Sequence, residues 1–153
     1  MDIAIIGGGA AGFMAAITAR KTNTKANVTI FERASKVLAK VEVTGGGRCN
    51  VTNSFAAITD LKQAYPRGDK LMKRLFNVFD YKDTYRWFEQ HRVPLVTQED
   101  ECVFPKAQDS HAIINCLTRQ AASVGVKISC RSQLKDIYHT ADGRFELHFG
   151  GGE

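Results

Sequence analysis

The chain has 153 residues, of which 44% are hydrophobic and 24% are charged, a balance typical of a folded globular domain and not of a disordered segment. This length is sufficient for one domain with a sizeable core. The formal net charge of +5 comes from 21 basic and 16 acidic residues. It fits an anionic cofactor and a solvated exterior, and since no basic run is interleaved with aromatic residues, nucleic-acid binding is not favoured.

The apolar stretch between residues 3 and 19 resembles a signal peptide or membrane helix only in its hydrophobicity. Asp2 stands where a signal peptide carries positive charge, and four glycines interrupt the stretch. None of the four cysteines forms a C-x-x-C pair, and no histidine has a metal-ligand spacing, so neither a disulfide framework nor a metal site is indicated. We expect a reduced, cytoplasmic protein with no membrane partner.

The first residues predict a buried strand that runs into a glycine turn. The apolar run Asp2–Ile6 is typical of a parallel strand covered on both faces. A G-x-G-x-x-G motif follows, in which Gly7 permits a tight turn, Gly9 lets backbone approach a pyrophosphate, and Gly12 lets the next helix pack closely on the strand. Ala10 begins that helix, and the N–H groups at its N-terminus would hold phosphate charge.

A helix and a second strand complete this unit. The helix is predicted from Ala10 to Lys21, with Phe13, Met14 and Ile17 spaced to lie on a sheet. The second strand, from Asn27, ends at Glu32, about 20 residues after Gly12, where an acid can accept a hydrogen bond from a ribose hydroxyl. Because a carboxylate would repel a 2′-phosphate, the motif favours FAD or NAD over NADP, and it does not distinguish FAD from NAD.

A second glycine cluster occupies residues 45–53, with the sequence Gly-Gly-Gly-Arg-Cys-Asn-Val-Thr-Asn. Three consecutive glycines are costly inside a helix or strand and suit a loop that lies against a flat or charged ligand. Arg48 can pair with phosphate, while Asn50, Thr52 and Asn53 offer short polar groups. A glycine-rich surface loop is the alternative interpretation. Cys49 has no evident activating partner and is interpreted as a small packed residue near a ligand.

These motifs together resemble a known family. The run Ile-Ile-Gly-Gly-Gly-Ala-Ala-Gly at residues 5–12, the Phe-Glu-Arg ending of the second strand and, above all, residues 44–53 are similar to the bacterial NAD(P)/FAD-dependent oxidoreductases, flavoproteins of the BaiN-like, YhiN-like or aminoacetone-oxidase-like type. Members of this family carry basic residues shortly before the second motif, and Lys40 matches one of them in this chain. The Val-Phe-Pro element of the family is matched at residues 103–105.

The resemblance implies FAD with its ADP part on residues 7–12 and Glu32, and with its diphosphate and ribityl-flavin portion near residues 45–53. No catalytic residue is assigned, because flavin carries the redox chemistry. The candidate cofactor-binding residues are Gly7, Gly9, Ala10, Ala11, Gly12, Glu32, Arg33, Lys40, Gly45, Gly46, Gly47, Arg48, Cys49, Asn50 and Thr52.

The rest of the chain predicts alternating helices and short strands. A helix over 70–79, capped by Asp69, would place Leu71, Leu75, Val78 and Phe79 on one face. A helix over 83–92 carries Tyr85, Trp87 and Phe88, which are interpreted as core residues. The further predicted elements are strands at 93–97 and 101–105, a helix from 109 to 124, a strand at 126–130, and a hairpin of 134–140 and 144–149 around Ala-Asp-Gly.

The fold expected from the resemblance is a Rossmann-like α/β FAD/NAD(P)-binding three-layer fold, with a mainly parallel sheet and an antiparallel hairpin from a truncated meander. Residues 1–153 are then expected to be the N-terminal part of an FAD-binding domain that is incomplete at its C-terminus, inactive alone, and able to self-associate through an unpaired strand edge. The whole enzyme would transfer electrons through FAD between NAD(P)H and a small-molecule substrate. The alternatives are a non-catalytic dinucleotide-binding module and a flavoprotein acting on RNA.

Overall fold

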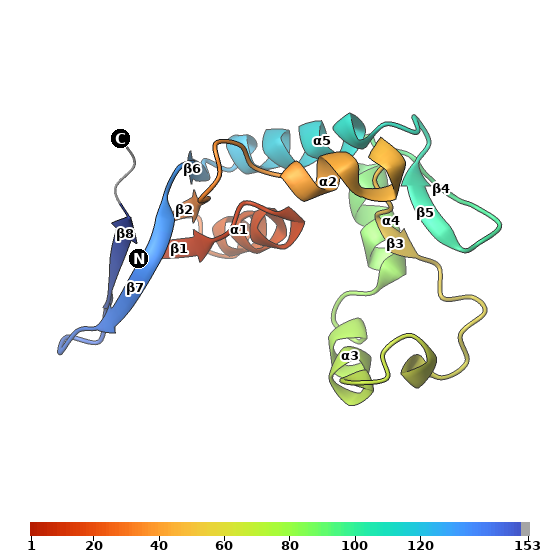
Figure 1. Ribbon diagram of the computed structural model, residues 1–153, viewed down its shortest axis with the longest axis horizontal. Helices are drawn as coiled ribbons and strands as arrows, with labels where there is room; N and C mark the ends of the chain where they lie inside the picture. The colour runs from red at the N-terminus through yellow and green to blue at the C-terminus, as the bar shows by residue number, and fades with distance from the viewer. Residues whose placement is uncertain (151–153) are drawn as a thin grey trace. The chain divides into compact units, whose positions relative to one another are not determined.

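The computed structural model describes residues 1–150, which form two compact units (Figure 1). The first unit contains Met1–Val41 and the described residues from Leu117 onward, and the second contains Glu42–Cys116. The expectation about the end of the chain after the hairpin falls on residues 151–153 and lies outside the described residues. No helix within residues 1–150 is both long enough and apolar enough to cross a membrane.

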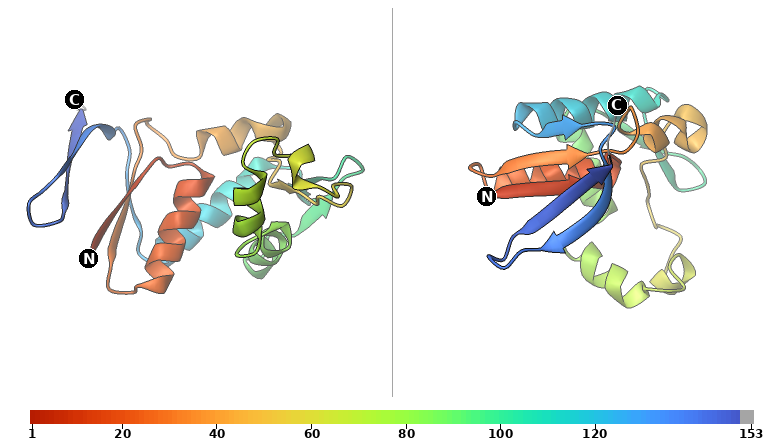
Figure 2. Two further views of the ribbon diagram at one scale, coloured as in Figure 1. Left: turned by 90° about the horizontal axis from the view of Figure 1, so that it is seen from below. Right: turned by 60° about the vertical axis from the view of Figure 1, so that its left-hand side comes forward.

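A parallel β-α-β arrangement forms the first unit. Its elements are β1 (Asp2–Ile6), α1 (Ala10–Thr22), β2 (Asn27–Phe31) and β6 (Lys127–Ser129). The sheet has the order β1-β2-β6, and both strand pairs are parallel (Figure 2). The side chains of Phe13, Ala16 and Ile17 on α1 are buried, as are Val28 and Ile30 on β2. The predicted strand-helix-strand unit and the final parallel strand are therefore confirmed.

The expectation that β1 is buried on both faces is wrong for the described residues. Ile3 and Ile5 are half-buried, whereas Ala4 and Ile6 on the opposite face are exposed. A Cβ at Gly12 on α1 would lie 3.5 Å from Ile5, so α1 covers the first of these faces. Within residues 1–150, β1 pairs with β2 alone and forms an edge of the sheet. The face that carries Ala4 and Ile6 is exposed, although an apolar strand sequence is typical of burial on both faces.

The predicted hairpin is also present. It consists of β7 (Gln133–His139) and β8 (Phe145–Gly150), paired antiparallel. In its turn, Thr140 N–H donates to the carbonyl of Arg144 at 2.9 Å, and the side chain of Arg144 donates to Asp142 at 2.7 Å. The ring of Phe149 packs 4.5 Å from that of Phe31, which attaches the hairpin to the parallel sheet.

The second unit is built around a small antiparallel sheet of order β3-β5-β4. Its strands are β3 (Thr52–Asn53), β4 (Leu95–Thr97) and β5 (Cys102–Pro105). Its helical elements are α2 (Ala39–Val43, which begins in the first unit), the short turns η1 (Thr44–Gly47) and η2 (Leu61–Gln63), α3 (Asp69–Phe76), α4 (Tyr81–Gln90) and α5 (Ser110–Ser123, which continues into the first unit). Its core contains Phe88, Val93, Leu95, Val103, Phe104, Ile113 and Cys116. Phe88 is buried as expected, whereas Tyr85 and Trp87 are only half-buried.

Two helix starts differ from the prediction. Gly68, in a left-handed conformation with φ 89°, precedes α3, so Asp69 is its first helical residue and not its cap. The helix α3 ends at Phe76, three residues before the expected end. At α4, Asp80 accepts hydrogen bonds from the N–H groups of Lys82 and Asp83, and the Asp83 carboxylate accepts the N–H of Asp80. This capping box starts α4 two residues before the expected position.

The predicted apolar face of α3 does not enter the core. Leu71, Leu75, Val78 and Phe79 are 58%, 49%, 81% and 43% exposed. Periodicity identified the residues that share this side of the segment, but periodicity cannot show whether another element covers them. This face is thus an exposed apolar surface within the described residues.

Candidate functional site

The first glycine turn has the backbone geometry that its sequence predicted. Gly7 has φ +103°, a conformation that favours glycine, and its N–H donates to the carbonyl of Phe31 at 2.8 Å. A Cβ atom at Gly12 would collide with the carbonyl oxygen of Gly7. A Cβ at Gly9 would meet no atom within 4 Å. The structural roles of Gly7 and Gly12 are confirmed, and the backbone at Gly9 is open to a ligand.

Helix α1 begins at this turn without a side-chain cap. Gly9 is the N-cap, no side-chain cap is formed within residues 1–150, and the first turn contains no acid. The first intrahelical bond runs from Phe13 N–H to the carbonyl of Gly9, which leaves the N–H groups of Ala10, Ala11 and Gly12 without helical acceptors. Because Gly9, Ala10 and Ala11 are exposed, these donors and the positive end of the helix dipole suit an anion.

Glu32 supports the same turn directly. One carboxylate oxygen accepts the N–H of Gly8 at 2.8 Å, and the other accepts the N–H of Ala34 at 2.8 Å. These N–H donors, that of Ala34 first and then that of Gly8, lower the pKa of the Glu32 carboxyl, and the charge of Arg33 adds to the effect. Each oxygen keeps a further lone pair for a sugar hydroxyl. The sequence predicted that Glu32 would bind the ribose, but it did not predict that the same carboxylate would hold the glycine turn through hydrogen bonds.

The segment after Glu32 closes over Gly8. Leu38 N–H donates to the carbonyl of Gly8 at 2.7 Å, and its side chain is fully buried. A Cβ at Gly8 would lie 2.6 Å from a methyl carbon of Val37, so this glycine is required by close packing. Arg33 and Lys40, the two basic candidates of this segment, are both exposed. Leu38 and Val37 carried no sequence signal for this contact beyond their hydrophobicity.

The second glycine cluster forms a left-handed turn. Gly45, Gly46 and Gly47 have φ values of 59°, 68° and 83°, and Cys49 N–H donates to the carbonyl of Thr44 at 3.0 Å. A Cβ at Gly45 would lie 2.7 Å from the ring of Phe104 and 2.8 Å from the backbone nitrogen of Asn50, whereas a Cβ at Gly46 would meet open space. The expected irregular loop is confirmed, and its middle glycine exposes the backbone.

Arg48 is held by groups from within the second unit. Its Nε donates to the carbonyl of Gly45 at 3.1 Å, and its guanidinium lies 4.2 Å from the centroid of the Phe104 ring. A terminal nitrogen donates to the side-chain oxygens of Gln108 at 3.3 Å and Gln98 at 3.5 Å. All these partners are neutral, so the positive charge is positioned but not neutralised by them. The two glutamines were missed in the sequence, where isolated glutamines give no functional signal.

Cys49 is a packed thiol. Its side chain is buried, and desolvation raises the pKa of the thiol to about 11, so it is not ionised at neutral pH. Asn50 donates through its amide to the sulfur of Cys102 at 3.3 Å, and Thr52 lies on β3, paired with Val103. All four cysteines are free thiols. Among residues 1–150, no group of three or more His, Cys, Asp or Glu side chains is arranged to hold a metal ion.

The predicted site residues fall into two sets, one in each unit. Gly7, Gly9, Ala10, Ala11, Gly12, Glu32, Arg33 and Lys40 belong to the first unit, in which the glycine turn, the start of α1 and Glu32 come together at the carboxyl ends of β1 and β2. Gly45, Gly46, Gly47, Arg48, Cys49, Asn50 and Thr52 belong to the second unit, in which the left-handed turn and β3 lie beside β5.

A parallel β-α-β unit with an open glycine turn and an uncapped helix N-terminus defines a nucleotide-binding domain of the Rossmann type. Comparison with protein families sharpens this class, since the model of the HI0933-like protein Rossmann domain matches residues 1–153. The chain belongs to this family of FAD-binding oxidoreductases. The resemblance noted in the sequence is thereby confirmed.

Two known proteins illustrate the relationship. The chain is 28% identical over 142 residues to a 3-dehydro-bile acid delta(4,6)-reductase of Clostridium scindens, an alignment that covers 92% of this chain and 34% of the reductase. The crystal structure of THI4 from Thermovibrio ammonificans aligns with a TM-score of 0.60 at 14% identity, over 95% of this chain and 45% of THI4. At this low identity, the alignment with THI4 shows only that the two chains share a fold. The chain spans about a third of the length of the curated reductase.

Proposed function

We propose that this chain supplies the FAD-binding part of a flavin-dependent oxidoreductase. The observation that carries the proposal is the open backbone at Gly9, at the start of an uncapped helix and beside a turn that Glu32 braces. A diphosphate needs this combination of free N–H donors, a positive helix end and space for close approach. Membership of a family of FAD-binding oxidoreductases supports FAD as the dinucleotide.

In this proposal, the first unit binds the ADP part of FAD. The N–H groups of Ala10, Ala11 and Gly12 donate to the diphosphate, and Glu32 accepts from the adenosine ribose. The ionised Glu32 carboxylate can accept further hydrogen bonds beside those from the N–H groups of Gly8 and Ala34, which supports the second role. Arg33 and Lys40 supply exposed positive charge in the same unit.

We also propose that the second glycine turn binds the flavin end of the cofactor. Arg48 carries a positive charge held by neutral partners, and Gly46 leaves the backbone accessible. Asn50 and Thr52 add polar groups that can bond the ribityl chain or the polar edge of the flavin. FAD supplies hydride and electron transfer when bound, while these residues bind and orient it.

The substrate and the electron donor belong to the same proposal. The curated relative is a reductase of a bile acid derivative. We propose that the whole enzyme of this family also reduces an organic small molecule, with NAD(P)H as the electron donor, in a reducing, cytoplasmic environment. Because this chain spans about a third of that relative, we assign cofactor binding to it and expect no turnover from the 153-residue chain alone.

Cofactor release tests the proposal. We expect purified protein to be yellow or to bind added FAD, and to release FAD on denaturation. Gly9→Val should block the diphosphate and Glu32→Ala should weaken adenosine binding, whereas Glu146→Ala, which removes an exposed acid from the hairpin, should retain the cofactor. A folded protein that binds no FAD would refute the proposal for this chain. Binding of NAD without FAD would refute the role given to the second turn.

A further inference from the structure

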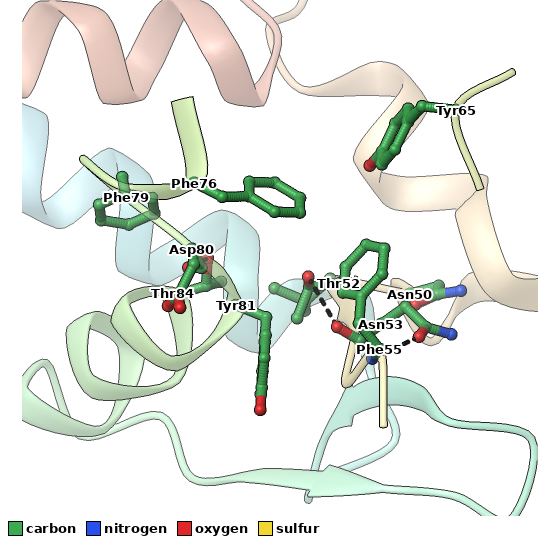
Figure 3. Close-up of a pocket in the computed structure, with 11 residues that line it drawn as sticks. Asn50, Thr52, Asn53, Phe55, Tyr65, Phe76, Phe79, Asp80, Tyr81 and Thr84 are labelled. Carbon is green, nitrogen blue, oxygen red and sulfur yellow. Dashed lines mark hydrogen bonds between the residues drawn. The ribbon is translucent and has the colours of Figure 1, made fainter. Parts of the chain in front are cut away.

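The second unit contains a pocket of about 470 Å³, drawn in Figure 3. This volume lies in the range of small-molecule sites. The pocket lies between the chain around β3 on one side and the end of α3 and the start of α4 on the other. Its lining residues are Asn50, Val51, Thr52, Asn53, Phe55, Tyr65, Phe76, Phe79, Asp80, Tyr81 and Thr84.

Aromatic rings form most of the apolar wall. The ring of Phe55 lies 5.4 Å from that of Phe76, which points toward it in Figure 3, and 6.3 Å from those of Tyr65 and Tyr81. None of these rings, nor that of Phe79, is fully buried. They stand apart from the core of the unit and surround a hollow, so they retain apolar surface that a flat molecule can cover.

The polar wall favours an uncharged ligand. The pocket has no Lys or Arg in its lining. Its one acid, Asp80, caps α4 through one carboxylate oxygen, and the positive end of the helix dipole offsets its charge. Thr84 donates its hydroxyl to the carbonyl of Asp80, and the side-chain oxygen of Asn53 accepts the N–H of Phe55. Asn50 and Thr52 supply neutral polar groups at the edge. A phosphate or carboxylate would find no cation among the lining residues, and the Lys82 ammonium lies 5.8 Å from the centroid of the Tyr81 ring, outside the lining. A flat ring system with one polar edge would be complemented.

We propose that this pocket binds a flat, uncharged, fused-ring organic molecule, the substrate of the oxidoreductase. This inference rests on the proposed function, because Asn50 and Thr52 belong both to the pocket wall and to the motif assigned to the flavin end of FAD. The same side chains would then separate the two ligands. Ring stacking on Phe55 and its neighbours provides affinity, and the asparagine and threonine groups fix which edge of the ligand faces the cofactor.

Titration of the 153-residue chain with 1-naphthol, by calorimetry, tests the pocket. We expect saturable binding of one molecule, both in FAD-free protein and in protein loaded with FAD. Phe55→Leu and Tyr81→Leu keep apolar volume but remove an aromatic face, so each should weaken binding about two- to ten-fold. Phe145→Leu makes the same change at an exposed ring in the hairpin and should leave the affinity unaltered. Tyr81→Leu decides the matter if circular dichroism shows that Phe55→Leu does not fold.

The outcomes separate this inference from the proposed function. No saturable binding, or equal weakening by Phe145→Leu, would overturn the pocket as a ligand site. Displacement of 1-naphthol by FAD would also overturn the inference, since the flavin rings would then occupy the pocket themselves. Pocket-dependent binding of 1-naphthol by a chain that binds no FAD would support the ligand site while refuting the flavin function.

Discussion

The turn at Gly7–Gly12 is closed by its own backbone and by Glu32, whereas the turn at Gly45–Gly47 is held by side chains that arrive much later in the chain. At the first turn, Gly12 is fixed by the carbonyl of Gly7. At the second, a Cβ at Gly45 would lie 2.7 Å from the Phe104 ring, and Arg48 is linked to Gln98 and Gln108, which are 50 and 60 residues away. The first turn is therefore specified by contacts within the β1-α1-β2 segment and the residues just after it, whereas the second depends on β5 and its neighbours, which are more distant in sequence.

The largest loss of stability is expected from a substitution in the first turn. Gly12→Ala places a Cβ against the Gly7 carbonyl, which cannot move without displacing α1 from β1, so we expect a loss of unfolding free energy of about 3 kcal/mol or more. Urea denaturation measures the loss. Gly9→Ala is the matched control, because its Cβ enters open space, and it should cost about 1 kcal/mol or less. Similar losses for the two variants would contradict the close approach.

The second turn should respond less strongly, because its obstacles include a ring that can shift. Gly45→Ala combines a left-handed φ of 59° with contacts to Phe104 and Asn50, so we expect about 2 to 3 kcal/mol of destabilisation. Gly46→Ala has a similar φ of 68° but meets no atom, and its cost should be only the conformational part, about 1 to 2 kcal/mol. Equal costs in thermal unfolding would show that Phe104 does not constrain the turn.

The smallest effect concerns the carboxylate that braces the first turn. Since folding lowers the pKa of Glu32 below its ordinary 4.5, the ionised group stabilises the fold fully above that value, and this contribution is lost as the pH falls toward the folded pKa. Glu32→Gln should remove this part of the pH dependence. The difference in unfolding free energy between wild type and variant should shrink as the pH is lowered below 4.5. A difference that grows on acidification would reverse the assignment.

Local patterns predicted much of the fold. The strand, glycine turn and helix from Asp2 to Thr22, the hairpin around Ala141-Asp142-Gly143, and the paired strands on either side of residues 98–100 all lie where the sequence placed them. Each is specified by residues that are close in sequence. The helix α2 was not predicted, because the run Ala39–Val43 is too short to show a periodic pattern. The start of α3 was placed one residue too late, because the residue before the helix is Gly68, in a left-handed conformation, and not Asp69.

In the candidate site, too, the features that local motifs encode were predicted, and those that depend on distant residues were not. The requirement for glycine at positions 7 and 12 followed from the motif, whereas the packing of Val37 on Gly8 and of Phe104 on Gly45 did not. Arg48 was identified as a cation, but its stacking on Phe104 depends on β5, which is distant in sequence. The aromatic pocket was missed as well, since its rings come from three separate segments and no spacing rule connects them.

The two connections between neighbouring strands of the parallel sheet differ greatly in length. Asp2 pairs with Asn27 across one crossover, and Thr29 pairs with Lys127 across another that contains the entire second unit. The second span is about four times the first, yet closure entropy grows only with the logarithm of length, so the added cost is about 1 kcal/mol. Insertions between β2 and β6 are therefore thermodynamically cheap, and differences in length among proteins of this fold should concentrate there.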